Sequence, residues 1–186
     1  MTYEKIIWNF LSDKINNPYG VAGLMGNLFA ESSLNPLLAN NIKKHGLTNE
    51  EYTAIADSGV NNNFVTDGIA YGLAQWCYHT RKKGLLTKAK AANKSIGDIN
   101  IQLEYLWDEI QQYKAVINVL YSAKTVREAS DIVLLKYEKP ANQTEGVKNL
   151  RARYGQKYFD KYAQKDLIRI KVSKKTAKEI KQKLEK

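Results

Sequence analysis

The sequence Ala30-Glu31-Ser32 lies at the end of a predicted helix, and Gly72-Leu73-Ala74-Gln75-Trp76 follows it about forty residues later. Helical spacing places apolar side chains of residues 21–28 in one stripe, and Glu31 projects about 20° to the other side of Leu24. We therefore expect Glu31 to flank the buried stripe. A half-desolvated carboxyl is harder to ionise, and a raised pKa suits a general acid near neutral pH.

The same glutamate has a simpler interpretation. A glutamate in the last turns of a helix is more often a solvated surface residue. Ser33 and Asn35-Pro36 should end the helix, because proline cannot continue helical geometry and also restricts the residue before it. The carboxylate is thus predicted to face a turn, where it is accessible to a ligand.

The length and charge predict one domain with a short basic extension. We expect the 186 residues to form a domain over residues 1–163 and a basic linker or tail over 164–186, since residues 165–186 carry +6 of the net +10 charge. A solvated linker is the simplest interpretation of that tail, and anionic wall polymers would also suit it. It holds no aromatic residues for stacking and follows no nucleic-acid-binding motif, so we expect no specific nucleic-acid partner.

The content of reactive residues is low. Cys77 is the single cysteine, and His45 and His79 have no metal-ligand spacing, so we expect no metal centre. No apolar run reaches the length of a membrane span, and residues 1–17 carry no signal-peptide core. We therefore expect no membrane segment, and delivery by a particle, by host lysis or as part of a longer polypeptide.

Most of the chain has helical patterning. Thr48/Glu51 and Thr125/Glu128 have the spacing of capping boxes, and Gly20, Gly23 and Gly26 would allow close backbone approach to a neighbour. The predicted helices cover residues 3–15, 19–32, 49–59, 80–92, 98–112, 114–121, 125–137 and 144–162.

One segment lacks helical character. Residues 61–76 contain turn formers, and Asp67-Gly68 between short apolar runs predicts a β-hairpin. The predicted fold is mainly α, of the α+β class: a helical bundle with one small hairpin beside a cleft that could hold a polymer.

Several motifs in order give the chain a resemblance to a known family. Over about residues 6–163 it resembles the phage tail lysozyme family of the lysozyme-like superfamily. The resemblance rests on residues 22–28, Ala30-Glu31-Ser32, Leu34-Asn35-Pro36, residues 71–76, Arg127-Glu128-Ala129-Ser130, Tyr137-Glu138-Lys139-Pro140 and the stretch from Arg153-Tyr154-Gly155 onward.

The resemblance implies a peptidoglycan glycosidase of the muramidase type, with Glu31 as the general acid. It implies no metal or organic cofactor, since one acid and the bound sugar suffice. It also implies that Gln75 and Ser32 lie close to the substrate, that Tyr71 and Trp76 offer apolar faces to the sugars, and that Tyr137 lines the cleft. The purely structural alternatives are that Gln75 stabilises a turn and that Trp76 packs against the core.

The identity of a second carboxylate decides the mechanism. Asp67 and Glu138 are the candidates for a water-activating base or charge stabiliser, although Asp67 is also an ordinary turn residue and Glu138 could form a structural ion pair. Without a second carboxylate, the muramyl hydroxyl could attack instead, which is lytic transglycosylase chemistry. A non-catalytic wall-binding module is a further alternative.

The implied setting is local penetration of a bacterial wall. The expected partner is the glycan strand of peptidoglycan, and further domains of a phage tail or conjugation protein are candidate partners. The expected location is a virion tail or the cell-wall face.

Overall fold

The computed structural model describes residues 2–59 and 63–163, and these residues form an assembly of helices. The predicted tail, 164–186, lies outside the described residues. The elements in chain order are α1 Tyr3–Ile15, α2 Pro18–Ser32, the 3-10 turn Ile42–His45, α3 Asn49–Ser58, α4 His79–Ala91, α5 Ile99–Ile110, α6 Lys114–Ser122, α7 Val126–Val133, the π turn Leu134–Glu138, α8 Glu145–Tyr158 and the π turn Phe159–Ala163.

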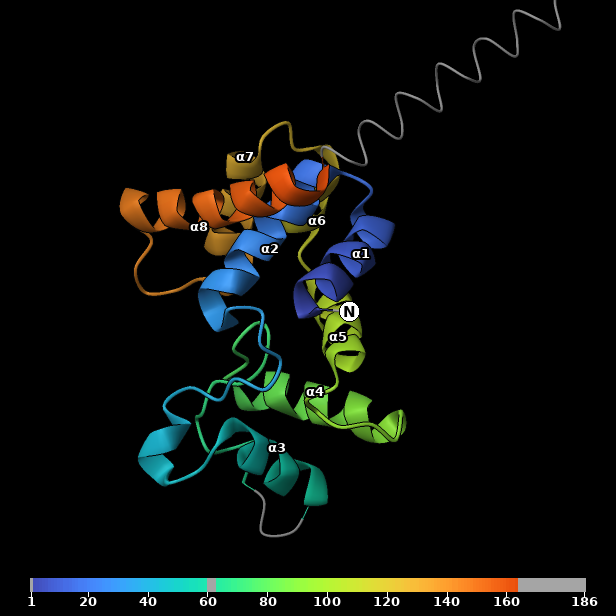
Figure 1. Ribbon diagram of the computed structural model, residues 1–186, viewed down its shortest axis with the longest axis vertical. Coiled ribbons are helices and arrows are strands. Elements are labelled where there is room, and N and C mark those ends of the chain that lie inside the picture. Colours follow the sequence, from blue (N-terminus) through green and yellow to red (C-terminus); the bar gives the residue numbers. More distant parts are fainter. Residues whose placement is uncertain (1, 60–62, 164–186) are drawn as a thin grey trace, which may run out of the picture.

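Helix α2 is the centre of the larger group of helices. Figure 1 shows it among α1, α6, α7 and α8, with α3 and α4 gathered at the other end of the molecule. Every residue from 20 to 28 is buried, so the predicted one-sided stripe was too narrow. This helix carries Glu31 on its last turn, and its position is therefore fixed by neighbours on nearly all sides.

The glycines of α2 permit these close contacts, as predicted. A Cβ at Gly23 would lie 2.5 Å from the Ala129 Cβ of α7, and one at Gly26 would lie 2.4 Å from the Arg151 carbonyl oxygen of α8. Gly20 approaches the Leu120 carbonyl in the same way. Absence of side chains on this face of α2 thus lets the helix that carries Glu31 approach α7 and α8 closely.

The helix ends follow the predicted chemistry. Thr48 and Glu51 form a complete capping box, with the Thr48 N–H donating to Glu51 Oε2 at 2.8 Å and the Glu51 N–H donating to Thr48 Oγ1 at 3.1 Å. At Thr125 only half of the box forms, because Glu128 accepts its bond from the Lys124 N–H instead. Helix α2 ends at Ser32, and Ser33 follows with φ of 52°.

The predicted β-hairpin over 61–76, and with it the α+β class, was wrong. In the described part of this segment (residues 61 and 62 lie outside it) there are turns and two isolated antiparallel bridges, Ala39 with Tyr71 and Tyr71 with Trp76. Residues 71–74 are all buried, so the segment lacks the alternation of inward and outward side chains that a two-stranded hairpin needs. The described fold is all-helical.

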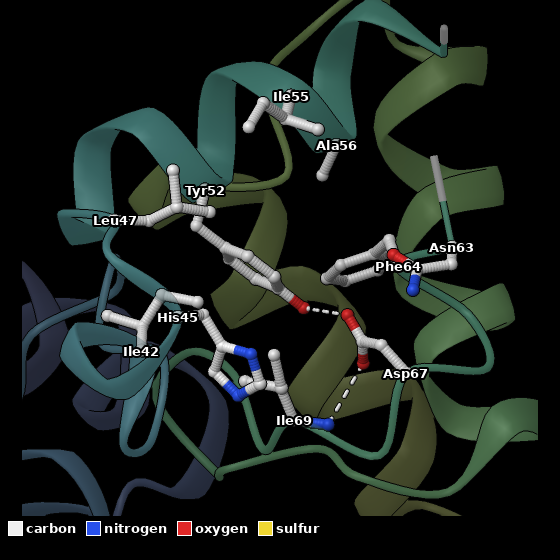
Figure 2. Close-up of a pocket in the computed structure, with 10 residues that line it drawn as sticks. All are labelled: Ile42, His45, Leu47, Tyr52, Ile55, Ala56, Asn63, Phe64, Asp67 and Ile69. Atoms are coloured by element: carbon white, nitrogen blue, oxygen red, sulfur yellow. Dashed lines mark hydrogen bonds between the residues drawn. The ribbon is translucent and has the colours of Figure 1, made fainter. Parts of the chain in front are cut away.

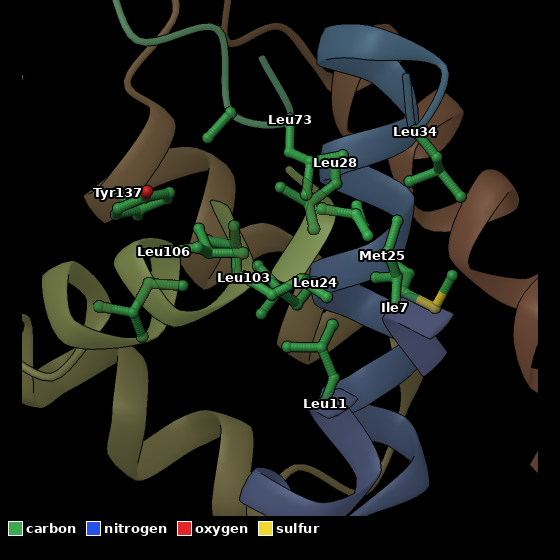
Figure 3. Close-up of a cluster of buried hydrophobic side chains, with 14 of the residues drawn as sticks. Ile7, Leu11, Leu24, Met25, Leu28, Leu34, Leu73, Leu103, Leu106 and Tyr137 are labelled. Atoms are coloured by element: carbon green, nitrogen blue, oxygen red, sulfur yellow. The ribbon is translucent and has the colours of Figure 1, made fainter. Parts of the chain in front are cut away.

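The 71–76 turn is anchored in the core instead. Figure 3 shows Leu73 reaching the apolar cluster beside Leu28 of α2, with Leu103 and Leu106 of α5 nearby. All four side chains are fully buried. The turn therefore has a fixed position relative to the end of α2.

Candidate active site

Glu31 lies on the last turn of α2 and forms an ion pair with α8. Arg151 Nη2 donates to Glu31 Oε1 at 2.5 Å. The side chain of Glu31 is 20% exposed and that of Arg151 is 9% exposed. The carboxyl is thus partly covered by protein and partly open to a ligand, as expected for a residue flanking the buried face.

A buried asparagine holds Arg151 in place. Asn27, one turn before Glu31, accepts a bond from Arg151 Nη1 at 3.2 Å, and its own amide donates to the Gly23 and Ser130 carbonyl oxygens at 3.0 and 3.1 Å. These contacts join α2, α7 and α8. The guanidinium beside Glu31 is therefore positioned by Asn27, which is itself held by backbone carbonyl oxygens of α2 and α7.

Glu138 lies on a π turn that follows α7. The turn ends at Lys139, which has φ of 49° and donates its N–H to the Leu134 carbonyl oxygen at 2.9 Å, before Pro140 stops further helix. Such π turns occur frequently at functional sites. Glu138 Oε1 is buried and has no hydrogen-bond partner within the described residues.

The surroundings of Glu138 keep its carboxyl neutral. Burial, followed by the negative charge of Glu31, raises the pKa of Glu138 to about 8 from its ordinary value of 4.5. The positive charges of Arg81 and Arg151 oppose this shift without cancelling it. Glu138 therefore holds a proton at neutral pH, and it lies close enough to Glu31 for the charge of that carboxylate to favour the neutral form of Glu138.

The neighbouring Tyr137 points to a different carboxylate. Its hydroxyl donates to Glu109 Oε2 of α5 at 2.5 Å, and Arg81 and Trp76 Nε1 donate to the same carboxylate. Burial makes ionisation of Glu109 costly, but the hydrogen bonds and charge of Arg81, with those of Tyr137 and Trp76, bring the pKa of Glu109 below its ordinary value. Glu109 is thus a buried carboxylate with a full set of donors.

Ser32 and Gln75 both contact backbone in this structure. The Ser32 hydroxyl lies 3.0 Å from the Leu73 carbonyl oxygen, and Gln75 Nε2 donates to the carbonyl oxygens of Leu38 and Gly72 at 3.0 and 2.9 Å. They tie the end of α2 and the 36–40 segment to the 71–76 turn.

Tyr71 and Trp76 are fully buried. Neither side chain has an exposed face, and the Tyr71 hydroxyl pairs with Thr53 Oγ1 at 2.7 Å while Trp76 bonds Glu109. In this conformation both rings pack in the protein interior and have no surface for a sugar.

Asp67 belongs to a separate cluster beneath a pocket of about 200 Å³ between α3 and the loops around it. Figure 2 shows its carboxylate accepting bonds from the Tyr52 hydroxyl (2.6 Å) and the Ile69 N–H (2.9 Å). Lys82 Nζ donates to the same carboxylate at 2.5 Å. Glu31 is not among the residues that line this pocket.

The structure therefore brings Glu31 and Glu138 together, whereas Tyr137 bonds Glu109 and Asp67 bonds Lys82. Sequence analysis missed Arg151 and Glu109. Glu109 lies one turn beyond Tyr105 on the apolar face of α5, and a charged residue on a buried face requires a partner. The position of Glu109 on an apolar helix face could therefore have identified it from the sequence.

Residues 2–59 and 63–163 contain no group of three His, Cys, Asp or Glu side chains suited to hold a metal ion. No helix within these ranges is long and apolar enough to cross a membrane.

A family model described as phage tail lysozyme matches residues 2–162, which include Glu31, Glu138 and the residues that surround them. This match confirms the resemblance seen in the sequence motifs. The family indicates a lysozyme-like, peptidoglycan-degrading function and a location at a phage tail or a bacterial cell wall. The chain belongs to the phage tail lysozyme family.

Proposed function

We propose that this protein cleaves the glycan strand of peptidoglycan between N-acetylmuramic acid and N-acetylglucosamine, with Glu31 as the general acid. The observation that carries the proposal is the pair of carboxyls, Glu31 and Glu138, in one partly buried place beside Arg151. Most glycosidases use two carboxyl groups whose different surroundings give them different pKa values.

Glu31 would transfer a proton to the leaving glycosidic oxygen while the anomeric carbon takes on oxocarbenium character. Its partly exposed side chain can reach a bound glycan, whereas Glu138 keeps one oxygen buried. After transfer, the Glu31 carboxylate stabilises positive charge on the sugar.

Glu138 would supply the proton that the pair needs near neutral pH. Burial and the negative charge of Glu31 raise the pKa of Glu138 to about 8, so Glu138 holds a proton near neutral pH. The proton would pass from Glu138 to the Glu31 carboxylate and from there to the leaving glycosidic oxygen as the glycosidic bond breaks, which leaves Glu138 ionised.

The other predicted residues have indirect roles in this proposal. Ser32 and Gln75 shape the wall of the site by holding the 71–76 turn, and Tyr137 fixes the π turn. Asp67, Tyr71 and Trp76 are given no contact with substrate, because their polar groups or ring faces are already engaged in the interior.

The test is mass spectrometry of soluble fragments released from purified Gram-positive peptidoglycan by the wild type, Glu31→Gln and Glu50→Gln. Glu50 is an exposed glutamate of α3 and serves as the matched control. We expect Glu31→Gln to keep its helical circular dichroism and to lose activity by about 100-fold or more, with Glu50→Gln close to the wild type.

The products also identify the reaction. Reducing-end muropeptides mean hydrolysis, and products lighter by one water mean intramolecular attack by the muramyl hydroxyl; both support a glycosidase. Retained activity in Glu31→Gln, or no soluble fragments from the wild type, would contradict the proposal.

A further inference from the structure

Glu109 is a buried carboxylate that collects hydrogen bonds from three separate parts of the chain. Trp76 Nε1 donates to Oε2 at 2.9 Å, Arg81 Nε donates to Oε1 at 2.6 Å, and the Tyr137 hydroxyl donates to Oε2 at 2.5 Å. Arg81 Nη2 adds a second bond to Oε2 at 2.8 Å. These donors come from the 71–76 turn, from α4 and from the π turn that carries Glu138.

Tyr137 is the link between this cluster and the active site. It also receives a hydrogen bond from Arg81 Nη2 at 2.9 Å, and its ring packs edge-on against Tyr113 with centroids 5.5 Å apart. Glu138 is the next residue, and its own Oε1 makes no hydrogen bond within the described residues. The side-chain contacts of its neighbour Tyr137 therefore help to hold the turn that carries Glu138.

We propose that Glu109 is a positioning residue, which fixes the π turn through Tyr137 and so keeps Glu138 beside Glu31. This inference rests on the proposed function. It assigns a role in the reaction to a residue on α5 that makes no contact with the substrate.

The cluster also governs the charge around Glu138. The charged groups that face Glu138 are Glu31 of α2, Arg81 of α4, Glu109 of α5 and Arg151 of α8, with Tyr137 on its own turn. Arg81 forms a bidentate ion pair with Glu109, so the negative charge of the carboxylate partly cancels the effect of the guanidinium charge on Glu138. Removal of the Glu109 charge leaves the Arg81 charge uncompensated, and Glu138 would then ionise at lower pH.

The experiment measures the alkaline limb of the pH dependence of peptidoglycan cleavage in Glu109→Gln, Trp76→Phe and the wild type. We expect Glu109→Gln to move the limb from near pH 8 to lower pH by roughly half a unit to one unit. Trp76→Phe removes one hydrogen bond to the same carboxylate but no charge, so its limb should stay in place.

Equal loss of activity in Glu109→Gln and Trp76→Phe with both limbs unmoved would overturn the inference, since that result identifies a structural role only. If Glu109→Gln does not fold, Arg81→Gln carries the test. Removal of the Arg81 charge should move the limb to higher pH, and an unmoved limb would again overturn the inference. Glu31→Gln, measured alongside, separates the two proposals, because activity in that variant would refute the proposed function itself.

Discussion

The buried charged groups around Lys82 and around Glu31 differ in how completely their polar atoms are paired. In the cluster around Lys82, the ammonium donates to Asp67, to the Tyr52 hydroxyl and to the Ile69 carbonyl oxygen, which uses all three of its hydrogens. In the group around Glu31, the nearby Glu138 retains a buried oxygen with no partner in the described residues.

The difference separates a structural ion pair from a reactive one. A buried lysine whose ammonium hydrogens are all bonded has no free donor for a ligand. Burial lowers the pKa of Lys82, and the hydrogen bond and charge of Asp67 oppose that shift. A carboxyl with an unpaired oxygen and a raised pKa can still form a hydrogen bond and can give up a proton near neutral pH. Both properties are typical of catalytic sites. Burial of charge alone would not have told the two clusters apart.

The largest expected effect on stability comes from breaking the fully paired cluster. Asp67→Asn leaves the Lys82 ammonium buried without its counter-charge, and we expect a loss of about 3–5 kcal/mol in the free energy of unfolding, measured with urea. The matched control is Asp108→Asn, which breaks an exposed pair with Lys88 and should cost less than about 1 kcal/mol.

The same variant tests the assignment of roles. At a temperature where Asp67→Asn remains folded, it should still cleave peptidoglycan. A folded but inactive Asp67→Asn would reverse the comparison, because it would give Asp67 the catalytic role that we assign to the Glu31 pair.

The next effect, smaller per pH unit, is expected on the pH dependence of stability. Between about pH 4.5 and pH 8 the folded protein keeps a proton on Glu138 that the unfolded chain has lost, so wild-type stability should fall as pH rises through this range. Glu138→Gln replaces the neutral carboxyl by a neutral amide and should remove a slope of about 1.4 kcal/mol per pH unit. Urea unfolding at pH 5, 6.5 and 8 measures it, and identical slopes in both proteins would count against a buried neutral Glu138.

Much of the helical framework could be predicted from the sequence, because local signals determine it. The Thr48 capping box and the spacing of Gly20, Gly23 and Gly26 act over a few residues, and both appear in the structure as predicted. The Asp67-Gly68 turn signal was also real, since Gly68 has φ of 72°, but it does not close a hairpin. The buried residues that follow it fold into the core instead of pairing as strands.

The candidate site was harder to predict, because its partners are distant in sequence. Glu31 was identified from its place at a helix end, yet Arg151, which binds it, is 120 residues away. The sequence favoured Asp67 over Glu138 as the second carboxylate, because Asp67 was expected in a hairpin beside the cleft. Asp67 meets Lys82 from α4, whereas Glu138 meets Glu31, and no local pattern distinguishes these outcomes.

The central claim is that Glu138, beside Glu31, holds a proton near neutral pH. The most direct test follows the side-chain carboxyl carbons of ¹³C-labelled glutamates by NMR from pH 3 to pH 9, with Glu138→Gln to assign the signal. The account predicts one glutamate that titrates near pH 8 and is absent from the Glu138→Gln spectrum. Titration of every glutamate below about pH 5, close to ordinary values, would contradict it.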